Sequence, residues 1–377
     1  MVAVALLVVG GVAAQDPAPK AAPQPPAKGG PAANPKAKAT RKGGPRTPGR
    51  APTKGVRKAV DPLANPPEPA PDPAAPAAKG EAAPATSGTT RTRFKASVAG
   101  SDPLSMVYYP SKLGNTAPAV MLVHEKDRSS KDFVDQTVAE LKGMTLPEYL
   151  QKQGYAVLAV DLRGHGANPR RNLSRSEWAA VPGDIQTAYS CLVDRHNWGE
   201  LNLSKFGVVA MGEGANVAAA WAAGGGGVSS EGRAGDLGAL VVVSPTIAAP
   251  SPGLEARRSL TALAARVPID FLVGERDAAS FGLVDDAQQP PERSIRPILK
   301  RYRTNQVETF PSALHGYQLF RLEPNLTGTI VRFLEGTIKA KADEWEGRYL
   351  FTPVTYTEVK VTPNPVRIDP ATKKPAQ

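Results

Sequence analysis

Residues 206–216 read Phe-Gly-Val-Val-Ala-Met-Gly-Glu-Gly-Ala-Asn, in which an apolar run at 206–210 is followed closely by two glycines, Gly212 and Gly214. The run is apolar at consecutive positions, which is typical of a strand buried on both faces of a parallel sheet. The glycines permit a sharp turn into the helix-like stretch 215–223, because glycine adopts conformations that other residues avoid. These residues therefore predict a strand, a tight turn and a helix.

The same pattern repeats on both sides of this stretch. Four further apolar runs share it: 119–123, 156–160, 239–243 and 269–273. Other helix-like, amphipathic stretches separate the runs or follow the last of them: 138–153, 183–195, 260–265 and 322–340. Three more strand-like segments complete the pattern: 91–98 and 105–109, which form a hairpin at the start, and 307–310. This alternation predicts an α/β fold, a doubly wound and mostly parallel sheet with an antiparallel start.

The segment before this folded part has a different composition. Residues 16–90 hold 18 of the 38 prolines and twelve Lys and Arg against five Asp and Glu, with no aromatic residue. Such a segment buries too little apolar surface to offset its conformational entropy, so we predict a long disordered N-terminal tail. The tail carries most of the net charge of +11, and it lacks the aromatic residues that stack on bases, so no specific nucleic-acid binding is expected. We interpret it as a solubilising linker or as a segment that contacts an anionic surface polymer.

The first residues, 1–14, form an apolar run that ends in small residues and is too short for a membrane-spanning helix, which takes about 20 residues. We interpret the run as a secretory signal peptide, although no Lys or Arg precedes it, and a buried strand is the alternative. The predicted organisation is a signal peptide at 1–14, a tail at 15–89, a folded domain at 90–340 and a C-terminal extension at 341–377 with an edge strand. We therefore expect a secreted or periplasmic protein without a transmembrane segment.

Polar residues follow the predicted strands, where the functional groups of a doubly wound sheet gather. These segments are His124-Glu125, Asp161-Leu-Arg-Gly-His-Gly166, Gly212-Glu213, Glu275-Arg-Asp277 and His315-Gly-Tyr317. A single cysteine, Cys191, excludes a disulfide framework and a CxxC module, and its helical context predicts a buried thiol.

Together these motifs resemble the α/β-hydrolase fold, and among its members the dienelactone-hydrolase-like proteins. Asp161–Gly166 is similar to the D-x-R-G-x-G turn of that family, His124-Glu125 to its H-E pair, and His315-Gly-Tyr317 to the segment that carries the triad histidine. The resemblance covers about residues 91–340. It implies an ester or lactone hydrolase with His315 as the base and Asp277 as its acidic partner.

The nucleophile that the resemblance requires is missing. The elbow of the family is G-x-S-x-G, and in Ala210-Met-Gly-Glu-Gly214 its centre falls on Gly212, which has no side chain to attack a substrate. Centring the turn on Glu213 would instead place the large Met211 where a small residue is needed. Glycine suits the strained turn, so the elbow can persist as a shape after its chemistry has gone.

What remains is a partial site. Asp277 and His315 form the expected vestigial pair, and the backbone N–H groups of Glu213 and of the loop at His124 and Glu125 form the expected oxyanion-binding nest. We therefore predict a non-catalytic or impaired hydrolase-fold protein that binds a small ligand or a partner. The alternatives are a weak ester or lactone hydrolase that uses His315 with water or a displaced serine such as Ser244, and a purely structural module.

No cofactor is expected, and the glycine run 224–227 is interpreted as a surface loop with no role in phosphate binding. Glu125, Glu213, Asp277 and His315 are oxygen and nitrogen donors, but they lack the spacing of a metal-binding motif, so we predict no metal site.

Overall fold

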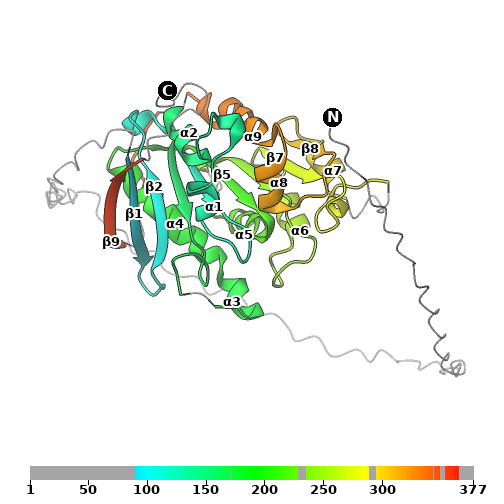
Figure 1. Cartoon of the computed structure of the whole chain (residues 1–377), viewed down its shortest axis with the longest axis horizontal. Coiled ribbons are helices and arrows are strands. Elements are labelled where there is room, and N and C mark those ends of the chain that lie inside the picture. The colour runs from blue at the N-terminus through cyan, green and yellow to red at the C-terminus, as the bar shows by residue number, and fades with distance from the viewer. Residues whose placement is uncertain are drawn as a thin grey trace, which may run out of the picture. The chain divides into compact units, whose positions relative to one another are not determined.

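The computed structural model describes residues 90–169, 171–227, 235–287, 294–342, 344–348 and 353–364 (Figure 1). The predicted signal peptide at 1–14 and tail at 15–89 lie outside these residues. Within the described residues nine strands form one sheet, in the order β8-β7-β6-β5-β3-β4-β2-β1-β9. Neighbouring strands are parallel from β8 to β4 and antiparallel from β4 to β9. The predicted doubly wound, mostly parallel sheet with an antiparallel start is confirmed.

The strands are β1 (Thr90–Val98), β2 (Leu104–Tyr109), β3 (Pro118–Val123), β4 (Ala156–Val160), β5 (Asn202–Met211), β6 (Leu237–Val243), β7 (Ile269–Gly274), β8 (Gln306–Phe310) and β9 (Val354–Pro363). The helices are α1 (Lys131–Val134), α2 (Leu146–Lys152), α3 (Arg175–Ala180), α4 (Pro182–Asn197), α5 (Gly212–Ala223), α6 (Ala256–Leu263), α7 (Arg296–Leu299), α8 (Gly316–Leu322) and α9 (Leu326–Leu334), and a π-helix, η4 (Glu335–Lys339), continues α9. Short 3₁₀ turns are η1 (Gly114–Thr116), η2 (Ala139–Leu141) and η3 (Phe281–Leu283).

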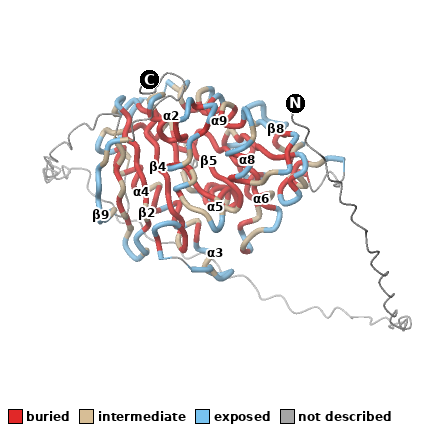
Figure 2. Tube along the Cα trace, viewed as in Figure 1, coloured by how far each residue is buried: buried red, intermediate tan, exposed pale blue. Residues whose placement is uncertain are grey.

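Buried apolar side chains of the described residues form two clusters, one on each face of the sheet. Successive strand residues alternate between them: Met121 and Val123 belong to one cluster, Val120 and Leu122 to the other. Helices α4, α5 and α6 contribute to the first cluster and α1, α2, α8 and α9 to the second. Figure 2 shows the resulting buried central strands between partly exposed helices. Burial on both faces explains why the strands are apolar at consecutive positions.

Several predicted helices differ from the observed ones at their boundaries, and the one expected over 260–265 is α6, at Ala256–Leu263. The helix expected over 138–153 begins only at Leu146, because Thr145 and Glu148 form a capping box, in which the Thr145 hydroxyl accepts from the Glu148 N–H and the Glu148 carboxylate accepts from the Thr145 N–H. The helix expected over 322–340 is interrupted between α8 and α9, where Pro324 precedes Asn325 at a φ of +70°.

The C-terminal extension is part of the folded unit. β9 begins directly after Pro353 and pairs antiparallel with β1 at the edge of the sheet. Before it, Arg348 contacts residues at the starts of β5 and β6. Its Nε is 3.0 Å from Asp236 Oδ1, and its Nη2 donates to Ser204 Oγ at 2.8 Å. Both side chains of the ion pair are largely buried, so this contact ties residues 344–348 to the strands.

The described helices include none with the length and apolar character needed to cross a membrane.

Candidate functional site

The turn between β5 and α5 has the shape that the sequence predicts. β5 ends at Met211 and α5 begins at Gly212, whose φ of +52° is in the left-handed region that favours glycine. A Cβ at Gly214 would collide with the carbonyl oxygen of His124, so only glycine allows the start of α5 to lie this close to the end of β3. The elbow therefore depends on both glycines, and Gly212 stands at its apex.

The space in front of Gly212 is filled by the side chain of Glu125, which follows β3. A Cβ built on Gly212 would lie 2.5 Å from Glu125 Cγ and 3.0 Å from its Cδ. Real Cβ atoms essentially never make contacts that close, so a side chain at position 212 and the present position of Glu125 exclude each other. The glutamate thus occupies the volume that a nucleophile on the elbow would need.

Glu125 is held there by hydrogen bonding and charge. Its Oε2 accepts a hydrogen bond of 2.8 Å from the backbone N–H of Tyr317, in the first turn of α8, and its Oε1 lies 3.8 Å from His315 Nε2. Burial raises the pKa of Glu125 above its ordinary value, while the Tyr317 N–H and the charge of His315 act in the opposite direction. The carboxylate therefore faces the ring nitrogen that would face the nucleophile in a complete triad.

His315 precedes α8 and makes the predicted contact with Asp277. Its Nδ1 is 2.9 Å from Asp277 Oδ2, and the hydroxyl of Ser280 lies 3.2 Å from the same nitrogen. Burial by itself would lower the pKa of His315, but the hydrogen bond and charge of Asp277 and the charges of Glu125 and Glu213 raise it above its ordinary value. The carboxylates of Asp277 and Glu125 on either side of the ring thus stabilise its protonated form relative to a free imidazole.

His124, predicted to help bind an oxyanion, uses both ring nitrogens to connect two loops. Its Nδ1 lies 2.7 Å from the carbonyl oxygen of Glu125, and its Nε2 accepts a hydrogen bond of 3.0 Å from the Leu162 N–H. These contacts require a neutral ring with the proton on Nδ1, and burial lowers the pKa of His124 to about 4. His124 therefore holds the backbone of Glu125 against the loop that follows β4.

The remaining candidates lie around this centre or away from it. Glu213 is in the first turn of α5 and is close enough for its charge to raise the pKa of both Glu125 and His315. Ser244 lies next to the elbow, since β5 and β6 pair at Met211 and Val243, but it is fully buried and its Oγ has no hydrogen-bond partner among the described residues. Cys191 is buried in the core, as predicted.

The side-chain position of Glu125 is the feature that the sequence did not predict, since only its backbone N–H was expected to contribute. A signal for it exists in hindsight. Gly212 and Gly316 both pack against the side chain of Glu125, and a Cβ at either position would collide with it. Among the described residues, no three His, Cys, Asp or Glu side chains converge in a way that could hold a metal ion.

The sheet order, the helices on both faces and the turn at Gly212 define the α/β-hydrolase fold. Residues 143–289 match a family model described as serine aminopeptidase, S33, which supports the α/β-hydrolase superfamily. No curated protein sequence matches the chain.

Several solved structures of low identity are similar in fold. A fungal esterase from Rhizomucor miehei is 15% identical, with a TM-score of 0.48 over 67% of this chain and 85% of the esterase. The acylaminoacyl peptidase of Pyrococcus horikoshii is 12% identical, with a TM-score of 0.46 over 67% of this chain and 42% of the peptidase. The protein TT1662 from Thermus thermophilus is 16% identical, with a TM-score of 0.44 over 66% of this chain and all of TT1662.

Proposed function

We propose that this is a secreted α/β-hydrolase-fold protein of the dienelactone-hydrolase-like type that has lost acyl-transfer catalysis and binds a small ligand or a partner. One observation carries the proposal: the side chain of Glu125 fills the space in which a nucleophile on Gly212 would stand. Covalent catalysis requires a nucleophile within hydrogen-bond reach of the base, and a glycine under a fixed carboxylate supplies none.

The electrostatics of His315 support the same conclusion. A histidine accepts a proton from a nucleophile or a water molecule only while its ring is neutral. The carboxylates of Asp277, Glu125 and Glu213 raise the pKa of His315, which makes the neutral base rarer at a given pH. His315 Nε2 lies 3.8 Å from the carboxylate of Glu125, in the direction where a nucleophile would be needed.

A weak or atypical ester or lactone hydrolase is the second candidate, and the preserved contact of 2.9 Å between His315 and Asp277 favours it. In that mechanism His315 Nε2 accepts a proton from water as the water attacks the carbonyl carbon. Ser244 does not support a displaced-serine mechanism, because its fully buried hydroxyl is out of contact with solvent.

Hydrolysis of short-chain aryl esters separates the two candidates. We expect the wild-type protein and the His315→Ala variant to show the same background rate, with Ser244→Ala as a control purified in parallel. Turnover by the wild type that disappears in His315→Ala, but persists in Ser244→Ala, would establish the hydrolase and refute the loss of catalysis.

Secretion and the role of the tail form a separate part of the proposal. The apolar run at 1–14 supports export, and the basic composition of residues 15–89 supports attraction to an anionic surface polymer. We expect the mature protein to bind such a polymer in a salt-sensitive manner. Binding that is unchanged when residues 15–89 are deleted would rule out the tail as the contact.

A further inference from the structure

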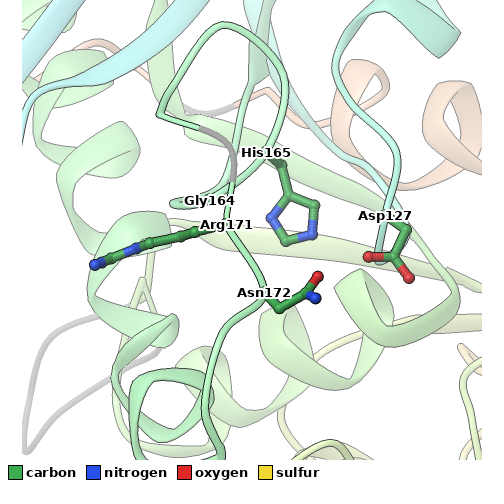
Figure 3. A pocket seen from close by; sticks show the side chains of 5 residues that line it. All are labelled: Asp127, Gly164, His165, Arg171 and Asn172. Atoms are coloured by element: carbon green, nitrogen blue, oxygen red, sulfur yellow. The ribbon is translucent and has the colours of Figure 1, made fainter.

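A second polar feature lies beside the candidate site. A pocket of about 320 Å³ is lined by Asp127, Gly164, His165, Arg171 and Asn172, and Figure 3 shows these residues from close by. Asp127 follows β3, two residues after Glu125, and His165 follows β4. Since β3 and β4 are parallel neighbours, both loops lie at the edge of the sheet that carries the elbow.

His165 is the buried polar group of this pocket, with an exposed fraction of 5%. Its Nδ1 lies 2.7 Å from the carbonyl oxygen of Arg163, and a carbonyl only accepts, so Nδ1 carries the proton and donates. In the neutral ring Nε2 is then an acceptor, and no described residue hydrogen-bonds to it. Figure 3 shows the ring directed between the side chains of Asn172 and Asp127.

The ring of His165 is held in this orientation by its neighbours. Trp178 meets it edge-on with ring centroids 5.8 Å apart, and the ring of His124 lies 5.2 Å away on centroids. A buried imidazole that is oriented by packing and hydrogen bonding, with one acceptor atom left over, is a preorganised contact for a ligand donor.

The other groups that line the pocket set the kind of ligand. Asp127 adds a carboxylate acceptor and Asn172 an amide that both donates and accepts, and neither side chain hydrogen-bonds to another described residue. Arg171 lies at the same pocket, with its Nη2 3.2 Å from Glu177 Oε1. An anion would meet the carboxylate of Asp127. The Arg171 side chain points away from His165 and Asp127 in Figure 3 and pairs with Glu177, so its charge does not select the ligand. A hydroxyl is neutral and both donates and accepts, so it suits every group present.

We propose that this pocket binds a neutral polyhydroxylated molecule, such as a monosaccharide, through two adjacent hydroxyls. One hydroxyl donates to His165 Nε2 and its neighbour donates to Asp127, while the Asn172 amide donates to a hydroxyl oxygen. The volume is at the lower end of the range of about 300–1,000 Å³ for ligand pockets, which fits a single sugar ring. The inference rests on the proposed function in one respect, namely that the domain binds a ligand.

The test is ligand-observed NMR on the full chain with D-glucose, D-galactose and N-acetylglucosamine, followed by calorimetry on the sugar that binds. We expect binding to weaken at least tenfold in His165→Phe, which keeps a packed ring and removes Nε2. We expect the same in Asp127→Asn, which removes the carboxylate charge and keeps a residue that tolerates the left-handed φ of +60° at this position. Lys126→Gln is the matched control, since Lys126 is an exposed neighbour that does not line the pocket, and it should bind as the wild type does.

Three outcomes would overturn the proposal: no sugar binds to the wild type, sugar binding persists in both pocket variants, or methylammonium binds in place of the sugars. Ester hydrolysis is measured separately on the same samples. Turnover that depends on His315 refutes the loss of catalysis but leaves sugar binding intact, so the two proposals can fail independently.

Discussion

Restoring a serine at position 212 should require a second change, at Glu125. Gly212→Ser places a side chain at a φ of +52°, which costs about 1–3 kcal/mol for a residue other than glycine. The new Cβ also lies 2.5 Å from Glu125 Cγ, and overpacking of that kind costs about another 1–3 kcal/mol. Glu125→Ala removes Cγ and Cδ, so it should recover the second cost and leave the first.

A double-mutant cycle measures this coupling. The free energy of unfolding is determined by urea denaturation for the wild type, Gly212→Ser, Glu125→Ala and the double variant. We expect the serine to cost about 1–3 kcal/mol less when Glu125 is already alanine. Gly214→Ala is the matched control, because its Cβ would collide with the His124 carbonyl oxygen, and Glu125→Ala should not reduce that cost.

Activity provides the second measurement of the same cycle. With Glu125 truncated, the serine can approach His315 Nε2, so ester hydrolysis should appear in the double variant and be absent from Gly212→Ser alone. Strictly additive stabilities, or full activity in Gly212→Ser alone, would show that Glu125 moves aside freely and does not block the elbow.

Three further predictions concern stability. Burial and the charge of Glu308 raise the pKa of Asp270 to about 8, so the folded state keeps a proton that the unfolded chain loses above about pH 4. The free energy of unfolding should therefore fall by up to about 5 kcal/mol as pH rises from about 4 to about 8. Urea denaturation across this pH range should show that Asp270→Asn lacks this decrease. Burial lowers the pKa of His124 to about 4, so stability should fall by about 3 kcal/mol as pH drops from about 6.5 to about 4, and His124→Gln should flatten that part of the same curve if the prediction holds. Arg348→Ala should lower the free energy of unfolding by about 1.5–3 kcal/mol, because it leaves Asp236 without its cation. It should also speed amide hydrogen exchange in residues 344–348. Unchanged exchange would mean that the ion pair does not hold this segment.

The sequence by itself determined most of the sheet and the shape of the elbow. Strands buried on both faces are apolar at nearly every position, so runs such as 119–123 and 206–210 reveal them without reference to the rest of the chain. The glycines at 212 and 214 are required by backbone conformation and close packing, which are local demands that local sequence can express. The helix boundaries were less predictable, because the cap at Thr145 and the break before Asn325 override apolar periodicity.

Only the tertiary structure decided which side chain packs against Gly212 at the elbow. Glu125, Gly212 and His315 come from loops that are far apart in the chain and meet because β3, β5 and β8 end at the same edge of the sheet. The direction of the Glu125 side chain depends on the His124 ring that fixes its backbone and on the Tyr317 N–H that binds its carboxylate. The His124 contact joins adjacent residues, but the Tyr317 contact joins segments that only folding brings together, so local sequence preferences do not contain it.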